Sequence, residues 1–445
     1  MKKWKRLVIA GIVVFGVLLV VPFLIPMSAY TRQAEQIAAE QLGVPVKLES
    51  MRLAFVPTPR LNVSGIVIGK DEEVRVKEVA VVPALSSLFS ETRVLSSVKL
   101  GEPVIKKGAL DILDALTKGE SKGPSPVTVR EIEVNKGRVD WPDMKLPEFN
   151  AEVTMTADNK PEAALIATTD GKLKLRLTPQ GETQAINLTA KDWTVPYGAP
   201  LHVDSLASDM ILKGNTLEIT QLDAGLYQGK VNGTATLDWT KDWQLNGKLK
   251  IDNMSVKEPV QLMSKATRVS GRLFSNGTFS AKSTEPAKLP EHLIANFNFD
   301  VKDGVLYGMD LSKASSLLLK QGQKGGETQF DEFSGIVQAK GKLYNFKDLK
   351  ISSGLMSASG NVKLMPDKHL DGVATVNIKN SATLAEIPLQ VSGTVQDPVV
   401  MPTKAALAGA AAGAAVGGPL GAGLGIKAAE GVEKLKGLFG SDQDK

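Results

Sequence analysis

The feature of this sequence that most constrains its fold is a strict alternation of apolar and polar residues over 230–251. Odd-numbered positions from Val231 to Trp239 are apolar or glycine, and polar residues fill the positions between them. After a polar break at 240–242, the alternation resumes and continues to Ile251. Successive side chains of an extended chain point to opposite faces. The stretch therefore predicts a hairpin with one polar face and one apolar face.

The same pattern recurs downstream. LNGKLKIDN at 245–253 aligns with LDGVATVNI at 370–378, and SGRLFSNGTF at 270–279 aligns with SGIVQAKGKL at 334–343. A hairpin unit is repeated here without any repeated group of polar residues. This favours a structure that is extended by adding strands.

Short alternating segments separated by turn signals fill 127–402, so this region is predicted to be almost entirely strand. The one long helix expected within it is 309–321. Gly233 and Gly247 are in phase with the apolar residues, which predicts mid-strand glycines at a close approach or a bend. The predicted turns are Asp170-Gly171, Gly214-Asn215, Asn276-Gly277, Asp303-Gly304 and Pro366-Asp367.

The N-terminal region predicts a membrane anchor. Residues 7–25 are uncharged and apolar, and this run is as long as a membrane-spanning helix. The basic residues within 1–6 place the N-terminus in the cytoplasm and the remaining chain across the membrane. A cleaved signal peptide is the alternative, but its apolar region is usually shorter and a small-x-small cleavage site is missing. A short amphipathic helix is predicted at 31–42.

The C-terminal region is rich in alanine and glycine. Residues 405–426 carry no charge and are bracketed by Lys404 and Lys427. Gly418-Pro419 interrupts the stretch, so two short helices are expected in place of one straight helix. The glycines that recur every fourth position and let helix backbones approach closely are Gly409, Gly413, Gly417, Gly421 and Gly425. A helical hairpin packed on the body and membrane insertion or self-association both remain open.

These signals divide the chain into successive regions. A polar stretch rich in glycine and proline at 117–126 is the clearest predicted linker. The expected regions are a basic cytoplasmic segment at 1–6, an anchor at 7–25, an N-terminal β region at 26–116, the linker at 117–126, a repetitive β region at 127–402 and a helical tail at 403–445.

The residues that could perform chemistry are few. The chain has no cysteine, which excludes disulfides, thiolate zinc sites and cysteine nucleophiles. His202 with Asp204, and His369 with Asp371, could each supply two metal ligands, but their polar-side positions favour exposed cross-strand pairs. We find no catalytic sequence motif and no dense basic block beyond the first six residues. The sequence therefore predicts a protein that is not an enzyme, with no cofactor, no metal and no nucleic-acid partner.

A sheet with one apolar face has to cover it. A second sheet in a dry sandwich would do so without any ligand. The apolar positions are mostly Val, Leu, Ile, Ala and Gly, with few aromatic residues. Such a lining also suits acyl chains, which gain about 0.8 kcal/mol per buried methylene. The residues alone leave both interpretations open.

The order of several segments resembles the AsmA family of TamB-related periplasmic β-groove proteins. The segments at 42–69 and 74–105 are similar to the opening of that family. VKDGVLYGMDLSKASSLL at 301–318 is similar to its step into a helix. The segment at 330–376 resembles its C-terminal repeat, and VSGTVQDPVVMPT at 391–403 resembles its closing strand.

The resemblance implies a bacterial inner-membrane protein whose body lies in the periplasm. It implies a mainly β fold, an elongated, curved and incompletely closed antiparallel structure with a lipid-lined groove. Its implied partners are membrane lipids, with phospholipid as the expected class, the inner membrane, and the outer membrane or one of its proteins. The implied role is phospholipid transport, and the alternative is a scaffold or regulator of outer-membrane protein assembly.

The resemblance carries over no catalytic residue. The groove positions follow from the alternation, which chooses the apolar face as the inner one. The predicted lipid-facing residues are Val231, Ala235, Leu237, Leu245, Leu249, Ile251, Val362, Leu364, Ala374, Val376 and Ile378.

Overall fold

The structure of this protein is a computed structural model. It describes residues 27–56, 58–87, 93–109, 112, 127–141, 144–196, 201–263, 268–315, 325–354, 356–378 and 386–439. The predicted anchor at 7–25 and the predicted linker at 117–126 lie outside these residues. The chain divides into two compact units, Met1–Leu201 and His202–Lys445, which we call unit 1 and unit 2.

Unit 1 begins with helix α2 (Ser28–Leu42), which confirms the helix predicted at 31–42. The helix ends at Gly43, whose left-handed backbone (φ 68°) lets its N–H donate to the carbonyl of Ala39. The Glu35 carboxylate accepts a hydrogen bond of 2.8 Å from the backbone N–H of Leu48 and so ties the helix to the first strand.

The strands of unit 1 form a mixed sheet. They are β1 (Val46–Ala54), β2 (Arg60–Ile68), β3 (Val74–Pro83), β4 (Arg93–Gly101), β5 (Val104–Lys106), β6 (Val127–Val129), β7 (Glu131–Trp141), β8 (Met144–Lys145), β9 (Phe149–Met155), β10 (Pro161–Thr168), β11 (Leu173–Gln180) and β12 (Thr183–Thr194). A short 3₁₀ turn, η1 (Leu85–Ser87), separates β3 from β4.

The expectation of a purely antiparallel structure is wrong for unit 1. Strand β4 pairs in parallel with β6 and β7, and β5 pairs in parallel with β7. Parallel neighbours need a long connection, and the chain between β4 and β6 provides one. The strands before and after the predicted linker therefore pair with each other within unit 1.

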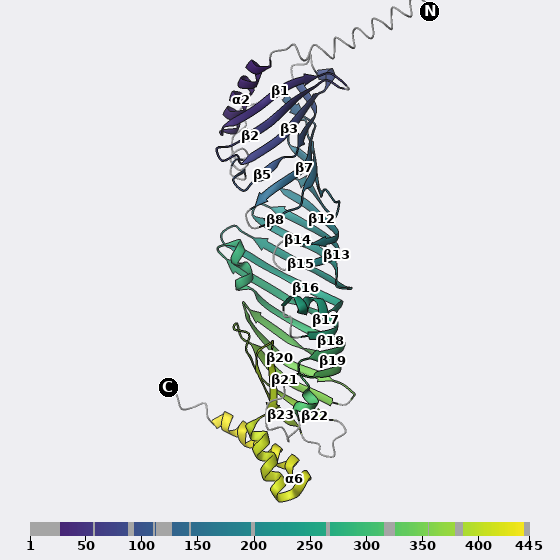
Figure 1. The fold of residues 1–445 in the computed structure, drawn as a ribbon, viewed down its shortest axis with the longest axis vertical. Helices are drawn as coiled ribbons and strands as arrows, with labels where there is room; N and C mark the ends of the chain where they lie inside the picture. Colours follow the sequence, from purple (N-terminus) through teal and green to yellow (C-terminus); the bar gives the residue numbers. More distant parts are fainter. Residues whose placement is uncertain are drawn as a thin grey trace, which may run out of the picture. The chain divides into compact units, whose positions relative to one another are not determined.

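Unit 2 is a sequential antiparallel sheet in which each strand pairs with the next (Figure 1). Its strands are β13 (His202–Lys213), β14 (Thr216–Leu226), β15 (Gly229–Asp238), β16 (Trp243–Ser255), β17 (Arg268–Ser283), β18 (Ile294–Tyr307), β19 (Glu327–Lys340), β20 (Leu343–Ser352), β21 (Met356–Leu364), β22 (Leu370–Ile378), β23 (Ile387–Gly393) and β24 (Pro398–Pro402). Among the described residues, no pairing joins β24 to β13, so the sheet of unit 2 stays open.

Irregular pairing recurs along unit 2. The register shifts between β13 and β14, β14 and β15, β16 and β17, β17 and β18, β19 and β20, and β20 and β21. Asn253, Asp303 and Asp348 adopt a left-handed backbone within or beside these irregular pairings, a conformation that Asn and Asp tolerate better than other residues. Bulges bend a strand and increase its twist, so they give this sheet its curvature.

Two predicted turns are wrong. Asn276-Gly277 lies within β17 and Asp303-Gly304 lies within β18. Gly277 is directly opposite both Leu249 and Phe297, so a small residue is needed at a close approach and not at a turn. Asp303 belongs to the irregular stretch of β18 described above. The predicted turns at 170–171, 214–215 and 366–367 are confirmed.

Short helices connect some strands of unit 2. They are α4 (Lys257–Met263) after β16, η2 (Pro286–His292) after β17 and α5 (Leu311–Ala314) after β18. The helix predicted at 309–321 is described only as α5, whose first turn is capped by Asp310 through the N–H of Lys313. Residues 316–324 lie outside the described part of the chain.

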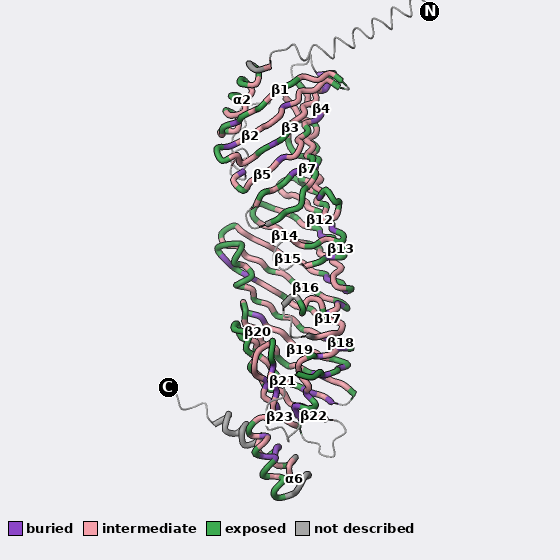
Figure 2. Tube along the Cα trace, in the orientation of Figure 1, coloured by how far each residue is buried: buried purple, intermediate pink, exposed green. Residues whose placement is uncertain are grey.

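The core of unit 2 is formed by residues of β18 to β24 together with Leu311 and Ala314 of α5. Buried segments are frequent around β21 to β23 in Figure 2. Ala314, Val376 and Leu389 are completely buried there, and Val400 is nearly so. In contrast, the apolar residues of β15 and β16 are mostly half-buried. Apolar side chains therefore stay partly accessible over the first strands of unit 2, while the last strands enclose them.

Helix α6 spans Lys404–Phe439, and its two halves fold back on each other. A straight helix would place Gly409 and Gly425 about 24 Å apart. A Cβ atom at Gly409 would instead lie 2.5 Å from the carbonyl oxygen of Gly425. Ala406, Ala410 and Ile426 form a separate small core between the two arms. The two expected helices are therefore the two packed arms of α6.

Among the residues that the structure describes, no helix combines the length and the apolar character needed to cross a membrane. The span predicted at 7–25 is not among those residues.

Candidate functional site

The hairpin predicted from the alternation is confirmed as β15 and β16. Val231 lies opposite Ile251, Ala235 opposite Gly247, and Leu237 opposite Leu245. Directly opposed residues of an antiparallel pair share a face of the sheet. These apolar side chains therefore lie together on one face, which we call the apolar face of unit 2.

The apolar face continues without a break from β15 to β23. Each of these strands contributes one residue to a row, and each residue of the row lies directly opposite a residue of the next strand. Its members, in spatial order, are Gly233, Leu249, Gly277, Phe297, Val337, Phe346, Val362, Gly372 and Val391. Nothing polar interrupts the row across nine strands, which is the geometry that a continuous apolar groove requires.

Glycines in this face lie beside large side chains. A Cβ at Gly247 would collide with the Phe279 ring, and a Cβ at Gly277 would collide with the Phe297 ring. The rings can therefore lie flat over the neighbouring backbone. The result is a lining with few projecting side chains.

The row leads into an apolar cavity of about 380 Å³ within unit 2. Its walls come from β17 to β24, with Val260 of α4 and Leu311 of α5 contributing from the connections. Among the described residues that line it, Ser359 is the one with a polar side chain. Ligand pockets usually have volumes of about 300–1,000 Å³ and a few placed polar groups. This cavity has the volume but almost none of the polar groups, so it suits an aliphatic chain.

The predicted groove residues fall into three groups. Val362, Leu364 and Ala374 line the cavity. Val376 is completely buried in the core beside it, and Ile378 packs against that core. On the apolar face of β15 and β16, Val231 is buried, and the half-buried residues are Ala235, Leu237, Leu245, Leu249 and Ile251. Lipid contact at these eleven positions remains a prediction.

Several lining residues were not identified from the sequence. Phe333 and Phe346 lie on strands whose register shifts between Ser334 and Ile336, which hides the alternation. Val260 and Leu311 belong to short helical connections, and only the packing of the chain brings them over the apolar face. The aromatic residues at 330–346 were the one signal that could have pointed to this part of the cavity.

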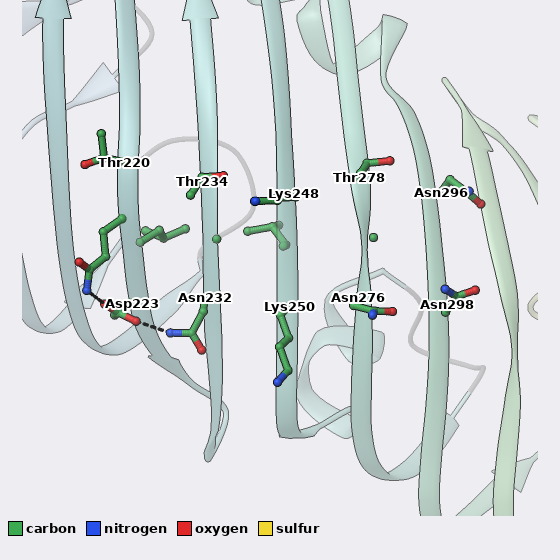
Figure 3. Close-up of a pocket in the computed structure, with 15 residues that line it drawn as sticks. Thr220, Asp223, Asn232, Thr234, Lys248, Lys250, Asn276, Thr278, Asn296 and Asn298 are labelled. Atoms are coloured by element: carbon green, nitrogen blue, oxygen red, sulfur yellow. Dashed lines mark hydrogen bonds between the residues drawn. The ribbon is translucent and has the colours of Figure 1, made fainter.

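The opposite face of the same strands is polar (Figure 3). One polar row runs beside the apolar one through directly opposed residues. Its members are Thr234, Lys248, Thr278, Asn296, Gln338, Asn345, Lys363 and Asp371. Figure 3 shows Asn276 and Asn298 on neighbouring strands of this face, and Asn232 donates a hydrogen bond to Asp223. Water can form hydrogen bonds with these polar side chains, so this face needs no protein or ligand to cover it.

One edge of unit 2 is formed by hairpin connections, and we call it the hairpin rim. Thr216 lies opposite Asp238, Ile294 opposite Lys340, and Tyr344 opposite Leu364, so every second connection falls on this edge. The hairpin rim comprises residues 213–216, 238–243, 282–293, 340–343, 364–370 and 393–398.

Two carboxylates of the rim are held by their own turns. The hydroxyl of Thr216 donates to Asp238 at 2.7 Å, and this bond together with the N–H of Thr240 keeps the pKa of Asp238 below its ordinary value. The backbone N–H of His369 donates to Asp367 and likewise lowers the pKa of that carboxyl. Both groups therefore stay ionised at neutral pH as turn residues.

The histidine pairs do not form metal sites among the described residues, where no cluster of three potential ligands occurs. The Nε2 atom of His202 lies 3.8 Å from a carboxylate oxygen of Asp204. The Nδ1 atom of His369 lies 3.1 Å from Asp367, and not beside Asp371 as the spacing suggested. All four of these paired side chains are exposed, as expected for surface pairs.

Comparison with known proteins gives one match. Residues 151–344 match the model of the AsmA family, a span that runs from β9 to β20 and includes the hairpin of β15 and β16. No curated protein and no solved structure matches the chain. The match includes the segment at 301–318 and the beginning of the segment at 330–376, whereas the segments at 42–69, 74–105 and 391–403 lie outside it. It indicates a role in membrane- or lipid-related processes. Over residues 151–344 the chain is similar to the AsmA family.

Proposed function

We propose that this protein binds lipid in the apolar groove of unit 2 and contributes to phospholipid transport and outer-membrane homeostasis. It does so from the bacterial inner membrane, anchored by residues 7–25, with its body in the periplasm. The protein is not an enzyme in this proposal, and it uses no cofactor.

One observation carries the proposal. The apolar row of β15 to β23 enters a cavity in which Ser359 is the one polar residue of the described lining. An acyl chain binds through its removal from water, and each buried methylene contributes about 0.8 kcal/mol to the free energy of binding. A ligand with several polar groups would leave them unpaired against this lining, which costs free energy. The chemistry of the cavity therefore favours a lipid tail over a polar metabolite.

The alternative is a scaffold or regulator of outer-membrane protein assembly in which the cavity is a dry packing defect. The two functions differ in what a larger side chain would do at Ala374. This residue lines the cavity on β22, whereas its neighbour Val373 points to the opposite face with 51% of its surface exposed.

The test compares Ala374→Phe with Val373→Phe in the full-length chain, extracted from membranes and studied by native mass spectrometry. We expect wild type and Val373→Phe to retain phospholipid in a defined ratio, and Ala374→Phe to retain less than about half as much because the ring fills acyl-chain space. Thermal unfolding reports whether each variant remains folded.

A lipid-free wild type would contradict the proposal. A stable Ala374→Phe variant with raised unfolding temperature and no lipid in any sample would establish a dry cavity. That outcome would favour the scaffold.

A further inference from the structure

The hairpin rim borders the apolar cavity and carries exposed lysines. Leu364 and Leu370 line the cavity and are the two ends of the turn that contains Lys368. Lys340 and Lys342 belong to the neighbouring turn, between β19 and β20. The two turns are separated by two strand spacings, or about 10 Å. All three lysines are exposed at the edge where the cavity wall ends.

The charges of the rim are unevenly compensated. Lys282 pairs with Asp242 at 3.0 Å, and Lys288 pairs with Glu285 at 2.7 Å. Among the described residues, Lys340, Lys342 and Lys368 form no ion pair. The rim lysines are Lys213, Lys241, Lys282, Lys288, Lys340, Lys342 and Lys368, and the rim carboxylates are Asp238, Asp242, Glu285, Glu291, Asp367 and Asp397. Beside the cavity the rim therefore carries three lysines and two carboxylates, Asp367 and Asp397, so this part of it has a net positive charge.

Aromatic residues mark the same boundary. Trp239 and Trp243 stack at the rim with their ring centroids 5.5 Å apart. They continue the alternation of Leu237 and Leu245 and so belong to the apolar face. Tryptophan favours the level where hydrocarbon meets polar groups, because one end of the ring is apolar and the other is a hydrogen-bond donor. The rim thus combines aromatic residues and lysines, as the interface of a bilayer does.

We propose that the hairpin rim binds the phosphate of a phospholipid headgroup through Lys340, Lys342 and Lys368 while an acyl chain occupies the apolar cavity. The proposal rests on the proposed function, because the acyl chain positions the headgroup at the rim. A lysine ammonium binds phosphate as a point charge, so the site does not require a fixed geometry. The lipid class that fits is a phospholipid, and an anionic one binds most tightly.

The experiment measures the binding of two lipids with identical acyl chains to the full-length chain by native mass spectrometry in detergent. One is a phosphatidylglycerol, and the other is the corresponding diacylglycerol without phosphate. The test variant is Lys340→Gln/Lys342→Gln/Lys368→Gln. The matched control is Lys248→Gln/Lys250→Gln/Lys363→Gln, which removes the same charge from exposed positions on the polar face.

We expect the test variant to bind phosphatidylglycerol about tenfold more weakly than wild type and to bind diacylglycerol unchanged. The control variant should bind both lipids as wild type does. The wild-type preference for phosphatidylglycerol should fall as salt is raised, because exposed charges are screened.

Equal behaviour of the test and control variants, with both lipids bound, would overturn the role of the rim and leave the proposed function in place. If no variant, wild type included, bound either lipid, the proposed function itself would fail.

Discussion

At the scale of single residues, the apolar face depends on glycine as much as on large side chains. Gly247 faces Phe279, and Gly277 faces Phe297, on directly opposed positions of neighbouring strands. Glycine in a strand interior usually weakens the strand. Here the absence of a Cβ lets each ring cover the backbone of the next strand. The glycines therefore smooth the lining of the groove.

This pairing predicts the effect of Gly247→Ala. The new Cβ would collide with the Phe279 ring and lie 2.9 Å from the carbonyl oxygen of Thr234. We expect unfolding of unit 2 to become easier by about 1–3 kcal/mol, as for other overpacked sites. Urea unfolding followed by tryptophan fluorescence measures the change.

Gly354→Ala is the matched control, because no atom lies within 4 Å of a Cβ built at that glycine. Its effect should stay within about 0.5 kcal/mol. Equal effects of the two substitutions would show that the close approach to Phe279 is not a constraint.

At the scale of elements, the alternating residues of the strands in unit 2 form one apolar face. The connections between the strands determine which part of that face is covered. Every strand from β15 to β23 contributes one residue to the apolar row. The short helices α4 and α5 add Val260 and Leu311 to the cavity, and α6 closes on its own core. The helices α4 and α5 therefore cover part of the apolar face that the strands form.

The packing of α6 predicts the effect of Gly409→Leu. Gly409 touches the backbone of Gly425, so a leucine there cannot fit between the two arms. We expect the arms to separate toward the usual interaxial distance of about 8–10 Å. Spin labels at Ala411→Cys and Ala428→Cys would report the distance, since the natural chain has no cysteine.

Ala412→Leu provides the control for α6, because Ala412 is exposed on the same arm. The label distance should not change in that variant. An unchanged distance in Gly409→Leu as well would mean that close glycine contact does not hold the arms together.

At the scale of the whole molecule, the groove and the C-terminal helix are separate features of unit 2. Pro398 is the last residue of the described cavity lining, and the two arms of α6 pack around Ala406, Ala410 and Ile426. The Thr403 hydroxyl caps α6 by accepting from the N–H of Ala406, which marks the boundary between them.

A chain that ends at Thr403 should therefore keep its lipid. We expect the lipid-to-protein ratio from native mass spectrometry to equal that of the full chain, because every described lining residue is retained. A folded truncated chain that lost its lipid would show that α6 takes part in holding it. Circular dichroism establishes whether the truncated chain is folded.

Sequence patterns predicted the strands well and the connections poorly. The alternation identified β15, β16, β21 and β22 because a half-buried strand exposes its period directly. Asn276-Gly277 misled the prediction of a turn, because the preference of a dipeptide for turns cannot show that a phenylalanine on the next strand needs the same space. The parallel pairing of β4 with β7 was missed for a related reason, since partners distant in sequence leave no local signal.

The sequence by itself determined that this protein is built from hairpins with one apolar and one polar face, and the order of its segments pointed to the AsmA family. Period-two alternation specifies which face each residue takes, since neighbouring side chains along a strand must point apart. Only the tertiary structure decided that the apolar positions of β15 to β23 join in one row and that α4 and α5 help to enclose a cavity at its end. Register, bulges and the packing of connections depend on contacts between distant residues, which no local pattern encodes.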